Sequence, residues 1–232
     1  MNKTDMKRII TILAAAAAIT ACTSPEAKYE KAVKGIIADY TAGYDGNTDV
    51  SSIVFVLCKG GSDADVRLYA RDGKGGWSGT LACDGHIGRN GAGKEREGDN
   101  KTPIGDFGII TAFGIKPDPG TALPYIDVTP DLWCCGDSIA YNRIIDINEY
   151  PHECTGEHLC EYEPAYNYAF FPDYNAECTF GLGSAIFFHC NGSKPYTAGC
   201  VAVDEEDMVA ILKALDPQSR VIIDTIPGIR TL

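Results

Sequence analysis

A histidine and a cysteine are the residues of this sequence that could do chemistry together. An apolar run ends at His189, and Cys200 follows a short way along the chain, directly after Gly199. Acyl transfer by a cysteine needs a thiolate, a base or cation beside it, and hydrogen-bond donors for the developing oxyanion. A neighbouring imidazole can lower the pKa of a thiol from about 8.5 towards neutral pH. The pair predicts a nucleophile, Cys200, activated by His189. The alternative is a buried strand histidine and a structural disulfide cysteine.

The residues around this pair favour the catalytic interpretation. Gly199 allows a tight turn, so the backbone N–H groups of Ala198, Gly199 and Cys200 are expected to point at the oxyanion. Cys190 directly follows the histidine. Because side chains alternate along a strand, we expect Cys190 on the opposite face, as a core or disulfide residue and not as a second nucleophile.

Two blocks of the sequence carry a family resemblance. The first is His189 followed by Thr197-Ala198-Gly199-Cys200, and the second consists of residues 85–91 (GHIGRNG) and 94–109 (KEREGDNKTPIGDFGI). Together they resemble the L,D-transpeptidase catalytic domain, the YkuD-like family, with its strand-end histidine, its Ser/Thr-x-Gly-Cys signature and its strand–loop–strand block. Shorter similarities lie at Tyr125 and at residues 138–142, 156–159 and 183–189. The resemblance runs from about Val54 to Ile223.

The resemblance implies a mostly β fold, a YkuD-like β-sandwich with a capping segment and a few short helices. Residues 118–177, which are rich in Pro, Tyr, Asn and Cys, are the candidate cap. It also implies a cysteine-dependent L,D-transpeptidase that forms peptidoglycan cross-links by attack on the diaminopimelate–D-alanine bond of tetrapeptide stems. No cofactor and no metal are implied, and the expected state is a monomer.

The same resemblance assigns roles to single residues. Cys200, His189 and Gly199 are the expected catalytic residues. Ala198 would contribute to the oxyanion site, Thr197 would support the turn, and the backbone carbonyl of Cys190 would orient the imidazole. The sequence departs from the family pattern at one place, because many members have an arginine two residues after the nucleophile and this chain has Ala202. That departure leaves open how the carboxylates of the substrate are held.

Two other functions stay open at this point. An L,D-carboxypeptidase would form the same acyl-enzyme and transfer it to water. A non-catalytic cell-wall-binding lipoprotein would keep the fold without the reaction, and the missing arginine is the feature in its favour. Papain-like peptidases place the cysteine before the histidine, and sortases separate the two residues much further, so neither class fits.

A zinc site is a further alternative, since cysteine and histidine side chains are its usual ligands. Six residues in the candidate cap could supply them: Cys134, Cys135, His152, Cys154, His158 and Cys160. None of these residues forms a Cys-x₂-Cys pair, so a disulfide-bearing loop is the favoured interpretation and no metal is expected.

The composition places the chain among folded proteins. Of its 232 residues, 45% are hydrophobic and 22% charged, which excludes wholesale disorder and collagen-like repeats. The formal net charge is −12, with 20 Lys and Arg against 32 Asp and Glu. A surface this negative repels phosphate backbones, so no nucleic-acid partner is expected.

The N-terminus has the pattern of an export signal. An apolar run follows the basic residues Lys3, Lys7 and Arg8 and is too short to span a bilayer. A short apolar run after a basic start is the pattern of a secretory signal peptide. The run ends in Ile19-Thr20-Ala21-Cys22, which resembles a bacterial lipobox with Cys22 as the lipidated residue. Ordinary cleavage near Ala21 is the alternative. The expected protein is lipid-anchored at a bacterial membrane, facing the periplasm or cell exterior, and contacts the membrane through that anchor only.

The remaining sequence divides into a tether and one domain. We expect a signal peptide at residues 1–21, a tether and amphipathic helix at 22–50, and the catalytic domain at 51–232. Ten cysteines are present. In an exported protein the spare cysteines indicate disulfides, up to four here, whose pairing the sequence does not define.

Hydrophobic patterns predict the main elements of that domain. The expected helices are 26–40 and a second one containing Met208, Ile211, Leu212 and Leu215, with Asp204 as its N-cap. The expected strands are 53–58, 66–69, 77–81, 107–113, 184–190 and 220–225.

Overall fold

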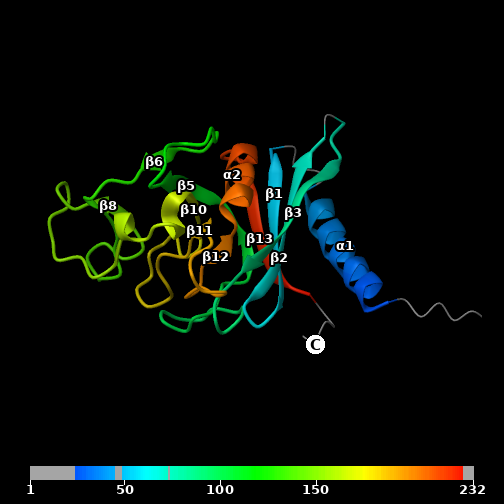
Figure 1. Ribbon diagram of the computed structural model, residues 1–232, viewed down its shortest axis with the longest axis horizontal. Coiled ribbons are helices and arrows are strands. Elements are labelled where there is room, and N and C mark those ends of the chain that lie inside the picture. Colours follow the sequence, from blue (N-terminus) through cyan, green and yellow to red (C-terminus); the bar gives the residue numbers. More distant parts are fainter. Residues whose placement is uncertain (1–23, 45–48, 73, 227–232) are drawn as a thin grey trace, which may run out of the picture.

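The structure, a computed structural model, describes residues 24–44, 49–72 and 74–226 (Figure 1). The expected signal peptide and the lipidation site Cys22 lie outside these residues. The helices are α1 (Pro25–Gly43) and α2 (Glu205–Ala214), with 3₁₀ turns η1 (Leu159–Glu161) and η2 (Ala165–Asn167). The strands are β1 (Ser52–Gly60), β2 (Asp63–Arg71), β3 (Trp77–His86), β4 (Gly105–Phe107), β5 (Ile109–Gly114), β6 (Tyr125–Asp127), β7 (Leu132–Cys134), β8 (Ile144–Asp146), β9 (Glu157–His158), β10 (Ala169–Pro172), β11 (Phe188–Cys190), β12 (Val201–Val203) and β13 (Arg220–Thr225).

Ten of these strands form one mixed sheet, in the order β4-β13-β1-β2-β3-β12-β11-β10-β5-β6. β1 lies between β13, to which it runs parallel, and β2, to which it runs antiparallel. Its apolar run is continuous because both faces of this strand are covered. The first strand after α1, β1, and the last described strand, β13, are therefore neighbours near the β4 edge of the sheet.

The two helices cover opposite faces of this sheet. Met208, Ile211 and Leu212 of α2 pack in a core with residues of β1, β2, β10, β11 and β12. Val33 and Ile37 of α1 pack on the other face, against residues of β1 and β13. Figure 1 shows α2 against the middle of the sheet and α1 at one end of the molecule. No helix in the described part of the chain has the length and hydropathy to cross a membrane.

A smaller layer covers the other end of the large sheet. It contains a three-stranded sheet, β8-β7-β9, and the turns η1 and η2. Its apolar side chains, among them Leu159 and Tyr166, pack against Phe113 of β5 and Phe171 of β10. This layer, which we call the cap, lies at the far end from α1 in Figure 1.

The described part of the chain is mostly β, with thirteen strands, and it agrees with the expected YkuD-like β-sandwich. The expected strand at 107–113 is two strands, interrupted at Gly108, where a Cβ atom would lie 2.7 Å from Oδ2 of Asp173. The expected strand at 184–190 is reduced to its last three residues. The preceding backbone instead bonds to side chains, since Ala185 N–H donates to Asn142 and Phe187 N–H to Cys200.

Candidate active site

Two neighbouring parallel strands bring the predicted pair together. β11 carries His189, and Cys200 directly precedes β12, whose register pairs Val201 with Phe188 and Ala202 with His189. Cys200 and His189 line the same cavity, of about 280 Å³. The sheet thus unites two residues that a loop separates in the sequence.

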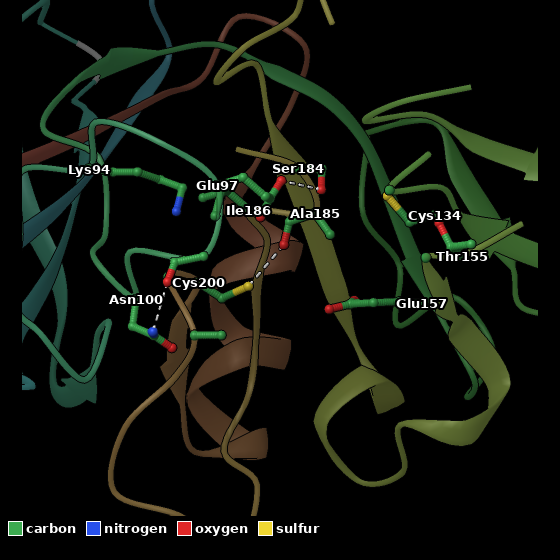
Figure 2. A pocket seen from close by; sticks show the side chains of 15 residues that line it. Lys94, Glu97, Asn100, Cys134, Thr155, Glu157, Ser184, Ala185, Ile186 and Cys200 are labelled. Atoms are coloured by element: carbon green, nitrogen blue, oxygen red, sulfur yellow. Dashed lines mark hydrogen bonds between the residues drawn. The ribbon is translucent and has the colours of Figure 1, made fainter. Parts of the chain in front are cut away.

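The thiol of Cys200 is held among backbone groups. Its side chain is almost fully buried, and Sγ donates to the carbonyl oxygen of Ala185 at 3.1 Å. The N–H of Phe187 donates to the same Sγ at 3.3 Å. Figure 2 shows the thiol pointing towards Ala185 from the turn that precedes β12.

Burial determines the protonation of both reactive groups. Burial and, to a smaller extent, the charge of Glu157 raise the pKa of the Cys200 thiol to about 12, against the lowering effects of Phe187 N–H and the Lys94 ammonium. Burial also lowers the pKa of His189 to about 4, although its bond to the Cys190 carbonyl opposes this change. The free protein therefore holds a neutral thiol and a neutral imidazole. The expectation that the imidazole lowers the pKa of this thiol is wrong for this state, because both groups are withdrawn from water.

The imidazole has a defined tautomer. Nδ1 of His189 lies 2.7 Å from the backbone oxygen of Cys190, and a carbonyl oxygen can only accept, so Nδ1 carries the proton. In the neutral ring, Nε2 is then a free acceptor. The ring of Tyr166 packs edge-on against the imidazole with the centroids 5.4 Å apart. The contact with the Cys190 carbonyl is the one that the family resemblance implies.

The side chain of Cys190 itself faces away from the site. It is buried in the core beside α2, and its Sγ donates to the carbonyl of Tyr168 at 3.4 Å. Cys190 is a free cysteine. The expectation of a core residue on the opposite face of the strand is confirmed.

The turn before the nucleophile is closed by a threonine hydroxyl. Thr197 Oγ1 accepts the N–H of Gly199 at 3.1 Å and donates to the carbonyl of Cys200 at 2.7 Å. One of the three expected oxyanion donors, Gly199 N–H, is therefore engaged within the turn. Among the described residues, no oxygen accepts the N–H of Ala198 or that of Cys200. These two groups are the remaining donors.

Gly199 is required by its backbone. Its φ is +151°, and a Cβ atom there would lie 2.9 Å from the carbonyl oxygen of Lys101 and 3.0 Å from Cδ1 of Ile186. Both neighbours are part of the packed wall around the thiol. Only a residue without a side chain fits this position unchanged.

We expect Gly199→Ala to destabilise the fold by about 1–3 kcal/mol and to lower kcat by about 100-fold, because the turn and the thiol must shift. Thermal unfolding and turnover measure the two effects. Gly120→Ala is the matched control, since Gly120 also has a positive φ, +101°, but has open space around its Cβ position. Equal effects of both substitutions would contradict this explanation.

A buried threonine that the sequence analysis did not single out connects this turn to the loop before β4. Thr102 Oγ1 donates to the carbonyl of Gly199 and accepts the N–H of Gly88, both at 2.8 Å. Thr102 is fully buried. Its only signal in the sequence is its place in the second block, so its contact with the turn could not be read from spacing.

The loop itself is organised by an ion pair. Nζ of Lys94 and Oδ1 of Asp99 are 2.9 Å apart, and both side chains are buried. Burial raises the pKa of Asp99, but the N–H groups of Glu95, Lys101 and Arg96 and the Lys94 ammonium outweigh it and hold this pKa well below its ordinary value. The loop is thus fixed in position beside the thiol.

Two cavities meet at Cys200. The first, of about 360 Å³, is lined by polar residues that include Lys94, Glu97 and Ser184 (Figure 2). The second contains His189 and the tyrosines 162, 166 and 196, with Lys194 and Ala202 on its wall. Cys200, Ala198 and Glu157 border both. Cys200 therefore lies where the two cavities adjoin.

Glu157, which sequence reasoning missed as a site residue, lies where these cavities join. It accepts a hydrogen bond from the hydroxyl of Tyr166. Burial raises the pKa of the Glu157 carboxyl to about 7, against the lowering effect of the Tyr166 hydroxyl. The charge state of Glu157 therefore changes near neutral pH, at the wall of both cavities that Cys200 lines.

Glu157→Gln tests this assignment through stability. The pKa of about 7 exceeds the ordinary 4.5, so the folded protein binds this proton more tightly than the unfolded chain does. The contribution of Glu157 is fully present below pH 4.5 and is lost as pH rises through 7. We expect the free energy of unfolding of Glu157→Gln, relative to the parent, to improve by about 1–3 kcal/mol between pH 4.5 and pH 8. Denaturant unfolding measures it. Glu206→Gln, exposed on α2, is the control, and the same trend there would contradict the assignment.

The comparisons with known proteins agree with this geometry. The family model of the L,D-transpeptidase catalytic domain (YkuD) matches residues 62–223, a range that includes His189, Cys200 and the Lys94 loop. The search of curated proteins gives no match. The matched range covers well over half of the 232 residues. The chain belongs to the YkuD family of L,D-transpeptidase catalytic domains.

Proposed function

We propose that this protein is a cysteine-dependent L,D-transpeptidase that cross-links peptidoglycan stems. The observation that carries the proposal is the meeting of two cavities at Cys200. A transpeptidase must hold an acyl donor and an acceptor amine on two sides of one nucleophile. The polar cavity with Lys94 and Glu97 and the aromatic cavity with Tyr162 and His189 offer one side for each stem.

The first half of the reaction forms a thioester. Cys200 Sγ attacks the carbonyl that links diaminopimelate to the terminal D-alanine, and Nε2 of His189 takes the thiol proton. The N–H groups of Ala198 and Cys200 stabilise the oxyanion. His189 then gives the proton to the departing amine, the C–N bond breaks, and D-alanine leaves. Because both groups start neutral, proton transfer accompanies the attack.

The second half transfers the acyl group. An amine of a second stem attacks the thioester, His189 accepts the amine proton, and the proton returns to the sulfur of Cys200 as the C–S bond breaks. The product is a direct diaminopimelate–diaminopimelate cross-link. The lipobox-like Cys22 would anchor the domain at a bacterial membrane, facing the periplasm or cell exterior, beside its polymeric substrate.

We propose Lys194 as the charge that compensates for Ala202. Both residues line the His189 cavity, and Lys194 lies over the ring of Tyr196, with 5.9 Å from Nζ to the ring centroid. We expect Lys194→Gln to raise KM by about 2- to 5-fold with kcat nearly unchanged, as the loss of one solvent-exposed ion pair would. Lys213→Gln, exposed on α2, is the control. An unchanged KM in Lys194→Gln would contradict this role.

The reaction itself is tested by product analysis. The purified protein is incubated with a disaccharide tetrapeptide, and the products are separated and weighed by liquid chromatography and mass spectrometry. Release of D-alanine together with a cross-linked dimer supports the proposal. Release of D-alanine with only the tripeptide product would make the protein an L,D-carboxypeptidase. No release by a folded protein with a free Cys200 thiol, from tetrapeptides with and without an added acceptor, would favour a binding protein.

A further inference from the structure

Four side chains that can ligate a metal gather in the cap, away from the reactive pair. They are Cys135, Asp137, His152 and Cys154, and their ligand atoms all lie within 4.8 Å of one another. Nε2 of His152 is 3.5 Å from Sγ of Cys135 and 3.4 Å from Oδ2 of Asp137. The residues come from two loops, one after β7 and one before β9.

The imidazole in this cluster is already oriented as a ligand. Nδ1 of His152 lies 2.8 Å from the carbonyl oxygen of Tyr150, so Nδ1 donates and Nε2 presents its lone pair to the other three residues. Histidines that bind metals usually donate their second nitrogen to such a carbonyl. The side chain of His152 is only 7% exposed, so the ring is held in place by the fold.

The carboxylate is oriented in the same way. Oδ1 of Asp137 accepts the N–H groups of Ile139 and Ala140, and Oδ2 accepts the N–H of Thr155 at 3.3 Å. Its side chain is 15% exposed. These bonds leave Oδ2 facing His152, so the cluster has its outer support without a bound ion.

The donor set is one that zinc prefers. Two thiolates, one imidazole and one carboxylate make four ligands, and structural Zn²⁺ sites are tetrahedral with such ligands. In the structure Cys135 and Cys154 are joined as a disulfide, with 5.7 Å between their Cα atoms. The four-ligand set therefore belongs to the dithiol form of the same pair.

We propose that the dithiol form of the protein binds one Zn²⁺ through Cys135, Asp137, His152 and Cys154. A phosphine reductant supplies the two electrons that break the S–S bond and becomes the phosphine oxide, its oxygen coming from water, which also provides the two thiol protons. Zinc then displaces both protons as the two Zn–S bonds form. Zinc and the disulfide are thus alternative ways to join the same two loops.

The link between the two loops, whether zinc or disulfide, lies beside the polar cavity that Cys200 lines. The neighbours of its ligands, among them Cys134, Gly136, Thr155 and Glu157, line the polar cavity beside Cys200 (Figure 2). The loops approach so closely that a Cβ atom on Gly156 would overlap the carbonyl oxygen of Cys134. Joining the loops therefore fixes one wall of the substrate cavity.

Three of the six residues considered from the sequence, Cys134, His158 and Cys160, lie outside this cluster. The ring of His158 stacks on Trp133 with the centroids 4.4 Å apart, and its Nε2 is 3.3 Å from Sγ of Cys160. Cys160 is a free cysteine outside the four-residue cluster. It therefore supplies a matched control, a nearby thiol whose loss leaves the proposed site intact.

The test is metal binding by the full chain, with no activity readout. The protein is reduced with the phosphine under anaerobic conditions, supplied with zinc, freed of excess metal and measured by elemental mass spectrometry. We expect one zinc per reduced chain and none in the oxidised chain. Cobalt(II) in place of zinc should show the intense visible bands of tetrahedral coordination and a thiolate-to-metal charge-transfer band.

Variants distinguish this site from binding by loose thiols. Cys154→Ser and His152→Ala should each weaken zinc binding by about 100-fold or more, whereas Cys160→Ser should bind like the parent. His152→Ala keeps both cysteines, so it remains informative if Cys154→Ser fails to fold, and circular dichroism checks the folding of each variant. Absence of zinc from the reduced, folded parent would overturn the proposal. Equal retention of zinc by folded His152→Ala would also overturn it.

Discussion

Cys200→Ala is expected to abolish acyl transfer, lowering kcat by about 10⁴-fold or more, since the substitution removes the thiol that forms the thioester. The fold should persist, because the substitution removes only a small buried side chain with bonds to Ala185 and Phe187. Release of D-alanine measures the activity, and thermal unfolding measures the fold.

Cys134→Ala is the matched control for this loss. Cys134 is a second free, buried cysteine on the wall of the polar cavity. Burial raises the pKa of its thiol well above the ordinary value, and the aromatic cavity that contains His189 is not lined by Cys134. We expect Cys134→Ala to keep most of its activity. Loss of turnover in Cys134→Ala together with activity in Cys200→Ala would contradict the assignment of the nucleophile.

The second large effect is expected at His189. His189→Gln removes the acceptor nitrogen Nε2, and a positioned general base contributes about 10²–10⁴-fold to a rate, so kcat should fall by that amount. The pKa of about 4 keeps this imidazole neutral, so it does not hold Cys200 as a thiolate at rest. The rate of Cys200 alkylation by iodoacetamide at pH 8 should therefore change little.

This pair of measurements separates two ways of activating the thiol. A base that acts during the attack predicts a loss of kcat with unchanged alkylation, whereas a resting ion pair predicts that both fall together. His86→Gln, a half-buried histidine on β3, is the control and should leave both rates near those of the parent. A parallel fall in both rates in His189→Gln would contradict the neutral resting state.

Much of the fold follows from local patterns. The last strand was expected at 220–225 and is β13 (Arg220–Thr225), and the expected helix at 26–40 is part of α1 (Pro25–Gly43). Asp204 stands at the N-cap of α2, but its side chain makes no capping bond and instead accepts the amide of Asn191. The two helices are amphipathic and β13 is a short apolar run, so their own sequences predict them.

The cap was much less predictable. Its strands β7, β8 and β9 have two or three residues each, too few for a period of alternation to be recognised. β10 (Ala169–Pro172) was missed because all four of its residues are buried, so it shows no alternation either. In the large sheet, β10 pairs with β5, which is distant in the chain, so this pairing could not be predicted locally.

The candidate site, too, could be predicted from the sequence only in part. His189 and Cys200 were identified from their types, their order and the resemblance to a family. Glu157 and Thr102 were not, because their roles depend on burial and on contacts that the fold creates: Glu157 with Tyr166, nine residues away, and Thr102 with Gly199, 97 residues away. The protonation of the reactive pair also required the structure, since burial reverses the effect expected from simple proximity.

The central claim is that Cys200 forms a thioester with a peptidoglycan stem. Its most direct test is rapid quenching of the protein with a disaccharide tetrapeptide, followed by intact mass spectrometry and peptide mapping. The account predicts an added mass equal to the stem less D-alanine, located on Cys200 and absent from Cys200→Ala. A stem adduct on another residue, or turnover that proceeds in Cys200→Ala, would contradict it.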